Sequence, residues 1–264
     1  MPTRVVVNGA LGRMGQEVAR AVLADSELRF VGAVEASASQ PYLPVPEYPD
    51  LIPLSSNLGS LIDKTCPDVV VDFTHAGVAM EAARVALPLK VNMVIGTTGL
   101  SAADLDEIRG LCDRHGAGAV VAANFSLGAV LLMHLAQIAS RFFDNAEIIE
   151  MHHDKKLDAP SGTALTTARM MAEARGSRFV YPPTEKEVLA GVRGGEVGGV
   201  AIHSIRMPGV MAAQEVLFGG KGQTLLLRHD ATSRESYMPG VMLAVKEVVK
   251  TRSLVVGLDK LMGL

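Results

Sequence analysis

The side chains best suited to acid–base chemistry lie close together in the segment 152–156. His152 and His153 are adjacent, and Lys155 and Lys156 follow after one intervening residue. Imidazole donates or accepts a proton near neutral pH, and an ammonium group supplies fixed positive charge. If the segment continues an extended strand, the two imidazoles point to opposite sides, so only one of them is the proton donor. The alternative is a loop of solvated charge without a chemical role.

The turn 160–163, with the sequence Pro-Ser-Gly-Thr, has the composition of a helix start. Ser161 is a typical N-cap, which places Gly162 and Thr163 in a first helical turn with unpaired N–H groups. Those groups, the helix dipole and the Thr163 hydroxyl can bind a carboxylate. Capping alone would explain Ser161 but not the histidines and lysines before it. Together the two segments predict a site that binds a small dianion and protonates it.

A second group of residues, near the N-terminus, predicts a dinucleotide site. Gly9, Gly12 and Gly15 follow a strand-like run at 4–8 and precede a helical pattern. Glycines in such a turn allow backbone N–H groups to approach a pyrophosphate at the helix N-terminus. Glu35 comes at the end of the next predicted strand, at the spacing typical of a carboxylate that binds ribose hydroxyls. An ordinary turn is the alternative explanation of the three glycines.

Two later segments favour the same interpretation. Residues 96–99 (Gly-Thr-Thr-Gly) and 122–125 (Ala-Ala-Asn-Phe) each follow a predicted strand. In an open parallel sheet the ligand lies at the carboxyl ends of the strands, so these segments could form a pocket for the nicotinamide ribose, although either could be a plain turn. Ala36 stands where NADP-selective enzymes often carry a basic side chain, and Arg13 could still reach a 2′-phosphate. The sequence therefore favours NADH use or dual use.

The bulk composition argues against several classes of partner. The chain has 264 residues and a formal net charge of −3, which gives no reason to expect nucleic acid or a membrane as a partner. No apolar run is long enough to span a bilayer. Cys66 and Cys112 do not make a disulfide framework, and we expect both to be small core residues in a reducing cytoplasm. The spacing of histidines, cysteines and carboxylates predicts no metal site.

Alternating strand and helix patterns must position these groups. In the first half of the chain the alternation predicts an α/β fold, a Rossmann-type parallel sheet covered on both faces. A long helix at 126–142 follows, and then several neighbouring strands predict an α+β domain with a mixed sheet. We expect a dinucleotide-binding domain over 1–125 and a substrate-binding domain over 126–233. The final helix, within 234–264, should return to the first domain.

The individual elements follow from apolar periodicity and from turn residues. The segment 41–53 is rich in proline and predicts an irregular surface loop, and the glycines at 219–222 predict a hairpin turn. Helices are predicted at 14–23, 78–86, 102–115, 126–142, 161–175 and 235–250, and strands at 4–8, 30–35, 68–73, 91–95, 119–123, 146–151, 200–207, 215–218 and 223–229.

These motifs resemble the 4-hydroxy-tetrahydrodipicolinate reductases (dihydrodipicolinate reductases) of bacterial lysine and diaminopimelate biosynthesis. The resemblance covers nearly the whole chain and rests on the segments 9–15, 72–74, 96–99, 123–126, 152–163 and 230–234. It implies a cytoplasmic oxidoreductase that uses NADH and/or NADPH and acts on a small dicarboxylate. The implied reaction reduces 4-hydroxy-tetrahydrodipicolinate to tetrahydrodipicolinate with loss of water. The sheet of the second domain would serve tetramerisation, giving a homotetramer.

The resemblance also implies a role for each matching residue. His152 would donate and accept the proton, and Lys156 would be a second proton donor. The implied substrate-binding residues are His153, Gly162 and Thr163, and the implied cofactor contacts are Gly9, Ala10, Leu11, Gly12, Arg13, Met14, Glu35, Gly96, Thr97, Thr98, Ala122, Ala123, Asn124 and Phe125. The chain departs from the family pattern at Ala36, which weakens the expectation of NADPH preference, and at 207–214, where many members carry a glycine-rich loop.

Two other functions stay open on the sequence alone. A different Rossmann reductase, such as a relative of aspartate or homoserine dehydrogenase, leaves the segment 152–163 unexplained. A dinucleotide-sensing regulator would bind NADH without turnover, and its second domain would need no clustered proton donors.

Overall fold

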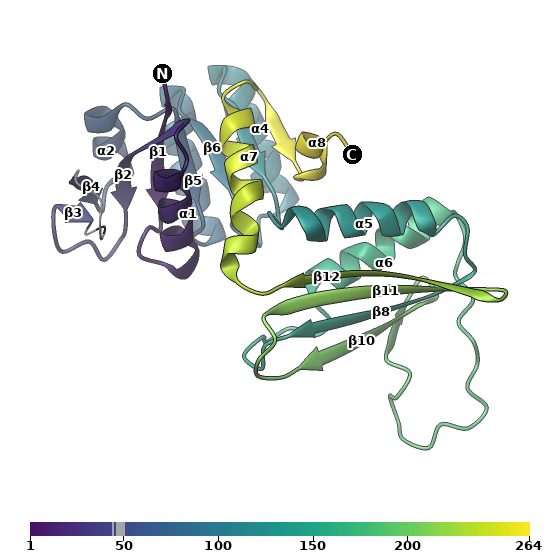
Figure 1. Cartoon of the computed structure of the whole chain (residues 1–264). Coiled ribbons are helices and arrows are strands. Elements are labelled where there is room, and N and C mark those ends of the chain that lie inside the picture. The colour runs from purple at the N-terminus through teal and green to yellow at the C-terminus, as the bar shows by residue number, and fades with distance from the viewer. Residues whose placement is uncertain (44, 46–50) are drawn as a thin grey trace. The chain divides into compact units, whose positions relative to one another are not determined.

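The computed structural model describes residues 1–43, 45 and 51–264, and the chain divides into two compact units (Figure 1). The first unit comprises residues 1–125 together with 237–264, and the second comprises residues 126–236. The C-terminal segment therefore packs with the N-terminal half of the chain, although the whole second unit lies between them in the sequence.

The first unit is built on an eight-stranded sheet in the order β13-β7-β6-β5-β1-β2-β4-β3. β1 (Thr3–Asn8) pairs in parallel with β2 (Leu28–Val34) on one side and with β5 (Val69–Asp72) on the other. Its other strands are β3 (Tyr42–Leu43), β4 (Ile52–Ser55), β6 (Asn92–Ile95), β7 (Ala119–Val121) and β13 (Leu254–Val256). All neighbours pair in parallel except β3 and β4. The strand order reverses at β1, so ligands are expected at the carboxyl ends of β1 and β5.

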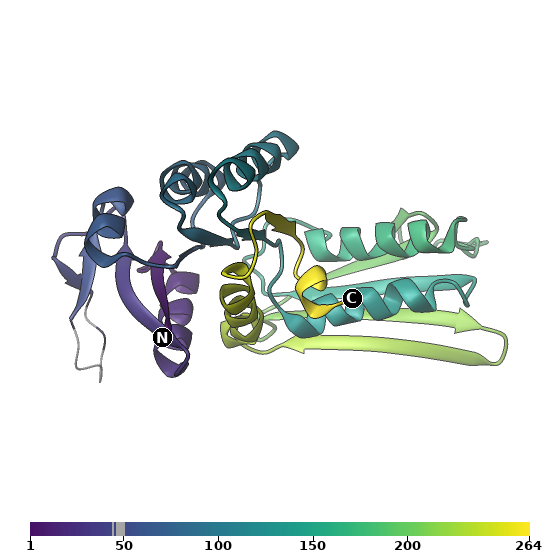
Figure 2. The ribbon, with the colours of Figure 1, turned by 90° about the horizontal axis from the view of Figure 1, so that it is seen from above.

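Helices cover both faces of this sheet, which is why its central strands are continuous apolar runs (Figure 2). α1 (Arg13–Ala24) and α7 (Met238–Val248) pack together on one face. The other face carries α2 (Leu58–Thr65), α3 (Ala76–Ala86) and α4 (Ala102–His115). The short helices η1 (Leu87–Leu89) and α8 (Asp259–Met262) also belong to this unit, whereas η2 (Arg234–Tyr237) lies at the boundary between the two units.

The second unit holds a five-stranded mixed sheet in the order β12-β11-β8-β10-β9. Its strands are β8 (Asn145–His152), β9 (Gly195–Val197), β10 (Val200–Arg206), β11 (Ala212–Gly220) and β12 (Gln223–Ala231). β8 and β10 pair in parallel, and the other neighbours are antiparallel. α5 (Leu127–Ala139) and α6 (Gly162–Arg175) lie side by side on one face and enclose a hydrophobic core (Figure 1).

The other face of this sheet is not covered by a helix of the second unit, as far as the structure describes it. Side chains alternate between the two faces of a strand, so Leu217 faces away from the buried Val216 and Phe218. Ile205 and Leu226 lie on the same open face, and both are exposed. Part of this face therefore presents exposed apolar side chains, whereas Glu147 on the same face is bound by Arg193 from the loop before β9.

The predicted fold class is confirmed, and so are the central strands and the long helices. The hairpin turn is also confirmed, because Gly220 pairs with Gln223 across β11 and β12. The segment 41–53 was predicted only as an irregular loop, but β3 and β4 lie within it; residues 44 and 46–50 are outside the described part of the chain. The predicted loop 207–214 is shorter than expected, since β11 begins at Ala212.

The expectation that both cysteines are core residues is wrong for one of them. Cys112 is buried inside the first unit, but Cys66 is exposed in a left-handed conformation at the end of α2. The apolar residues around Cys66 in the sequence belong to α2 and β5, whereas Cys66 itself lies in the turn between them. None of the helices that the structure describes has the length and apolar character to cross a membrane.

Candidate active site

The glycine loop connects β1 to α1 in a geometry that requires glycine. Gly9 has a φ of +77°, and a Cβ there would lie 2.8 Å from Cγ2 of Thr74. A Cβ on Gly15 would lie 2.1 Å from the carbonyl oxygen of Gly9, so only glycine lets α1 pack so close to the loop. Gly12 is the N-cap of α1 and offers no side-chain cap. The first-turn N–H groups of α1 can therefore bind a phosphate.

Glu35 directly follows β2 and reaches back to the glycine loop. Its Oε2 atom accepts a hydrogen bond from the N–H of Leu11 at 3.2 Å. Leu11, Gly12 and Arg13 are exposed, Met14 is half-buried, and Ala10 is buried. The structure thus brings the predicted ribose-binding carboxylate next to the predicted pyrophosphate-binding loop. These residues fit the adenosine half of a dinucleotide. The backbone of the glycine loop can bind the pyrophosphate, and the Glu35 carboxylate can accept hydrogen bonds from the ribose hydroxyls.

The fully buried carboxylate of Asp72 connects three strand ends of the first sheet. Its Oδ1 accepts hydrogen bonds from the N–H and hydroxyl of Thr74, at 3.0 and 2.8 Å, and from the hydroxyl of Thr97 at 2.8 Å. Its Oδ2 accepts the side-chain amide of Asn8 at 2.6 Å. The hydroxyl of Thr97, a predicted cofactor contact, is therefore used inside the protein. Thr98 is exposed.

The segments after β6 and β7 lie against each other through aromatic packing. A Cβ on Gly96 would lie 2.0 Å from Cε1 of Phe73, so the ring packs directly on the backbone of this segment. The ring centroids of Phe73 and Phe125 are 5.6 Å apart. Phe125 and Ala122 are buried, Asn124 is half-buried, and Ala123 is exposed. The segments 96–98 and 122–125 therefore lie at the carboxyl ends of neighbouring strands, and their role in a nicotinamide pocket stays a prediction.

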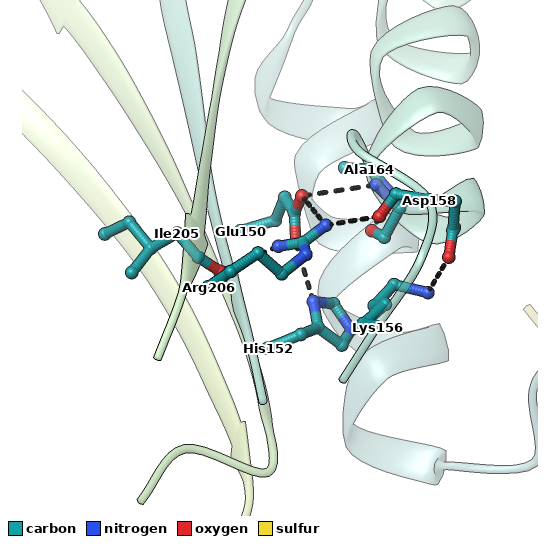
Figure 3. Close-up of polar contacts among 8 residues, drawn as sticks. Glu150, His152, Lys156, Asp158, Ala164, Ile205 and Arg206 are labelled. Atoms are coloured by element: carbon teal, nitrogen blue, oxygen red, sulfur yellow. Dashed lines mark hydrogen bonds and ion pairs between the residues drawn. The ribbon is translucent and has the colours of Figure 1, made fainter. Parts of the chain in front are cut away.

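In the second unit His152 stands at the end of β8 with one ring nitrogen already bound. Its Nδ1 lies 2.6 Å from Oε2 of Glu150, a residue two positions earlier on the same face of the strand (Figure 3). Glu150 is fully buried, whereas the side chain of His152 is 18% exposed. The carboxylate can accept only a proton-bearing nitrogen, which leaves Nε2 for a ligand. His152 therefore has the geometry of a proton donor and acceptor.

Arg206, at the end of β10, holds the same carboxylate from the other side. Its Nη1 and Nη2 lie 2.9 and 2.7 Å from the two oxygens of Glu150, and Nη2 also donates to the carbonyl of Asp158 at 2.7 Å (Figure 3). Two parallel N–H···O bonds of this kind fix both partners in orientation. Arg206 thereby connects β8, β10 and the loop that carries Lys156.

Lys156 lies in that loop beside His152, and its ammonium group is already paired. Its Nζ lies 2.7 Å from Oδ1 of Asp158, and its side chain is 22% exposed (Figure 3). The backbone N–H of Lys156 donates to the carbonyl of His153 at 3.2 Å. His153 is half-buried and directly follows β8. His152 and Lys156 are thus brought together, as the sequence predicted.

The turn before α6 has the predicted helix start. The hydroxyl of Ser161, the N-cap, accepts from the N–H of Ala164 at 3.2 Å, and Ser161 N donates to Oε1 of Glu150 at 3.2 Å. Gly162 is exposed, and a Cβ there would meet open space. Thr163 is half-buried at the second helical position. A carboxylate could therefore approach the N–H groups of this turn closely.

The charges around His152 act on its pKa in opposite directions. Burial lowers the pKa of His152, Glu150 raises it, and Lys156 and Arg206 lower it further, so that the pKa lies below the ordinary value. Burial raises the pKa of Glu150, but hydrogen bonds from Arg206, Ser204 and His152 lower it by more, and it lies below its ordinary value. Glu150 is therefore an ionised carboxylate at neutral pH, fixed beside a largely neutral imidazole.

Sequence reasoning missed Glu150 and Arg206 as parts of this site. The position of Glu150 two residues before His152 in a strand was a usable signal, because it places both side chains on one face. Arg206 carried no such signal, since its approach depends on the parallel pairing of β8 with β10, in which Arg206 lies opposite His152. Within the part of the chain that the structure describes, no cluster of three His, Cys, Asp or Glu residues could hold a metal ion.

Comparison with known proteins identifies the family. Residues 3–125 match a family model described as "Dihydrodipicolinate reductase, N-terminus", and residues 128–262 match "Dihydrodipicolinate reductase, C-terminus". The chain belongs to the dihydrodipicolinate reductase family. The resemblance predicted from the motifs is thereby confirmed, and it covers both halves of the chain.

Similar proteins from several organisms span nearly the same length. The protein named 4-hydroxy-tetrahydrodipicolinate reductase from Dehalococcoides mccartyi is 53% identical, with 100% of this chain and 99% of that protein covered. The protein of the same name from Moorella thermoacetica is 49% identical over 98% of this chain and 97% of its own length. The structure of dipicolinate-bound dihydrodipicolinate reductase from Paenisporosarcina sp. TG-14 superimposes with a TM-score of 0.89 at 41% identity, over 98% and 99% of the two chains.

Membership of this family settles the class of the protein. It is an oxidoreductase of a family with a Rossmann-type first domain, which implies use of NAD(P)H. The sequence alone left two alternatives open: a relative of aspartate or homoserine dehydrogenase, and a dinucleotide-sensing regulator. Neither accounts for matches to this reductase family over the two halves of the chain.

Proposed function

We propose that this dihydrodipicolinate reductase family member reduces 4-hydroxy-tetrahydrodipicolinate to tetrahydrodipicolinate, with loss of water, in lysine and diaminopimelate biosynthesis. The observation that carries the proposal is His152, held through Nδ1 with Nε2 left for a ligand, close to the open start of α6. A small dicarboxylate needs both parts, because one end must be bound while the ring is protonated. Dipicolinate, present in the structure of the similar protein, is a dianion of this size.

The substrate half acts through charge and proton transfer. The N–H groups of Gly162 and Thr163, together with the Thr163 hydroxyl, would bind one carboxylate of the substrate, and His153 would contact it from the end of β8. Reduced nicotinamide, when bound, supplies the hydride. His152 or Lys156 would then protonate the ring, and the positive charge of Lys156 would stabilise negative charge that develops there. A bound dianion would also raise the pKa of His152, which favours its protonated form.

The cofactor half would bind the dinucleotide through Gly9, Ala10, Leu11, Gly12, Arg13 and Met14 at the pyrophosphate and Glu35 at the adenosine ribose. Gly96, Thr97, Thr98, Ala122, Ala123, Asn124 and Phe125 would form the nicotinamide end. We propose NADH use or dual use, because Glu35 accepts hydrogen bonds and repels a 2′-phosphate, while Ala36 adds no positive charge. Arg13 is exposed and is the one basic side chain of the glycine loop.

The decisive test is turnover with substrate generated in situ by condensing pyruvate with aspartate semialdehyde. Oxidation of NADH and of NADPH is followed by absorbance, and the ratio of the two kcat/KM values measures cofactor preference. We expect turnover with NADH at least as efficient as with NADPH. Measurable NADH binding without turnover of either cofactor would support the sensing regulator instead.

Two substitutions separate the proposed roles. His152→Ala should lower kcat by about 10²-fold or more with a small change in KM, because a general acid acts in the transition state. Thr163→Val should mainly raise the substrate KM, because it removes a carboxylate contact made before and during the reaction. Equal effects of both substitutions on KM alone would contradict this division of roles.

The proposed assembly is a homotetramer built through the open face of the second sheet. Ile205, Leu217 and Leu226 give this face an apolar character that a second copy of the sheet could cover. Leu217→Asp should dissociate the assembly, which size-exclusion chromatography with light scattering would detect. A cytoplasmic location stays a prediction from cysteine usage.

A further inference from the structure

Glu150 is buried next to the proposed substrate site, and the function proposed above gives it no role. Its two oxygens accept hydrogen bonds from Nδ1 of His152 at 2.6 Å, from Arg206 at 2.7 and 2.9 Å, and from the N–H of Ser161 at 3.2 Å. One carboxylate thus binds the proposed proton donor, as Figure 3 shows, and also the N-cap of the proposed carboxylate-binding turn.

We propose that Glu150 is the positioning residue of this reductase. It holds His152 with Nε2 toward the substrate, and it also binds the N–H of Ser161. The proton donor and the carboxylate-binding turn therefore stay at a fixed distance and orientation relative to each other. This inference rests on the proposed function. Glu150 itself would not touch the substrate, because it is fully buried.

The chemical effect of Glu150 is on the tautomer of His152. A carboxylate accepts and does not donate, so the neutral imidazole must carry its proton on Nδ1 and present a free lone pair on Nε2. After the 4-hydroxyl group has left as water and a hydride has added at C4, the ring would be an enamine. When His152 is protonated, Nε2–H is the bond that breaks: the proton goes to a ring carbon of that enamine, whose electron pair forms the new C–H bond. The N–H electron pair stays on Nε2, and solvent restores the proton. The carboxylate stays ionised throughout, as the acidic partner of a catalytic triad does.

Arg206 makes this arrangement stable in a buried position. The groups that face His152 are Glu150 on its own strand, Arg206 on β10, and Lys156, paired with Asp158, in the following loop. The positive groups of Lys156 and Arg206 and the negative charge of Glu150 therefore act on the imidazole. Without Arg206 the buried carboxylate would lose its bidentate partner and would take up a proton more easily.

The same strand provides a control that separates positioning from simple stabilisation. Glu147, three residues earlier and on the opposite face of the sheet, also binds one arginine and one histidine: Arg193 at 2.6 Å and His203 at 2.9 Å. This second cluster resembles the first in composition but lies on the open face, away from the proposed site. Glu147 is 32% exposed whereas Glu150 is buried, so the two substitutions are compared by the pH profile of kcat and not by their effect on stability.

The experiment compares Glu150→Gln with Glu147→Gln in the full-length protein. The glutamine amide has the volume of the carboxylate and keeps one oxygen that can accept the N–H of Ser161. Its NH2 group can also donate to Nδ1 of His152, which allows the imidazole tautomer with the proton on Nε2. We expect Glu150→Gln to lower kcat by about 10²-fold with little change in KM, and Glu147→Gln to leave both near the wild-type values. Size-exclusion chromatography checks that the three proteins assemble alike.

The pH profile of kcat is the readout that a merely structural role would not move. The reaction needs protonated His152, so kcat falls as pH rises through its pKa in the complex. Glu150 raises that pKa, so its loss should move the fall to lower pH, whereas Glu147→Gln should leave it in place. Equal profiles in both variants, or equal losses of kcat, would overturn the proposal.

If Glu150→Gln does not fold, 15N NMR of the wild-type protein tests the proposal by showing which nitrogen of the His152 imidazole carries the proton. We expect the neutral His152 imidazole to carry its proton on Nδ1, and a predominant Nε2–H form would refute the proposal. The two levels of inference fail differently. A wild-type protein without turnover contradicts the proposed function, whereas normal wild-type turnover with an unaffected Glu150→Gln variant contradicts only the positioning role.

Discussion

Thr97 and Thr98 are adjacent residues with the same side chain, and the structure predicts opposite consequences for replacing them. The hydroxyl of Thr97 is buried and donates to Asp72 at 2.8 Å, whereas Thr98 is exposed. Valine has the shape of threonine without the hydroxyl, so Thr97→Val removes one hydrogen bond to a buried carboxylate and little else. The Oδ1 atom of Asp72 keeps its two bonds from Thr74.

The expected loss of stability follows from that bond count. A hydrogen bond to a charged group contributes about 1.5–3 kcal/mol, and because two donors stay in place we expect the low end, about 1.5 kcal/mol. For a unit of this size that corresponds to a fall in Tm of roughly 3–6 °C. Thr98→Val, at an exposed position, should change stability by less than about 0.5 kcal/mol.

The assay combines urea unfolding, followed by circular dichroism, with a titration of NADH fluorescence. The chain has no tryptophan, so the nicotinamide signal has little protein background. Thr97→Val should lose stability and keep its NADH affinity, and Thr98→Val should keep stability and lose affinity if its hydroxyl contacts the cofactor. A Thr97→Val variant as stable as the wild type but weaker in NADH binding would refute the reasoning, because the hydroxyl would then serve the cofactor and not Asp72.

Three further outcomes follow from particular contacts. Gly162→Ala should stabilise α6 by about 0.4–1 kcal/mol, because the added Cβ meets only open space in the protein. It should raise the substrate KM, because the Cβ would stand where the substrate carboxylate is proposed to bind. An unchanged KM would mean that the carboxylate binds elsewhere. Gly15→Ala should weaken NADH binding and lower Tm, because its Cβ would lie 2.1 Å from the carbonyl oxygen of Gly9; calorimetry and NADH titration test both. The pKa of Glu150 lies below the ordinary 4.5, so its share of stability is present above about pH 4.5 and is lost as the pH falls through the folded-state pKa. Urea unfolding across this acidic range should therefore show a smaller loss of stability in Glu150→Gln than in the wild type.

The sequence by itself determined the elements and the chemical inventory of the protein. Buried parallel strands such as Val69–Asp72 are continuous apolar runs, and Gly9, Gly12 and Gly15 indicate a turn that few other residues can form. α4 has the predicted bounds because Ser101 and Asp104 form a capping box and Gly116 ends the helix in a left-handed conformation. These are local signals, set by backbone sterics and by hydrogen bonds between near neighbours.

Only the tertiary structure decided how those groups are held in place. Arg206 lies more than fifty residues from Glu150 in the sequence, and their ion pair exists because β10 pairs with β8 in one register. Asp72 meets Asn8 and Thr97 for the same reason, across β1 and β6. Neither pattern is visible in the sequence, because strand pairing is non-local and a shift by one residue would turn every side chain to the opposite face. Residue types and local spacing predicted the proton donor and place Glu150 on the same face of β8, whereas strand register brought Arg206 to that carboxylate.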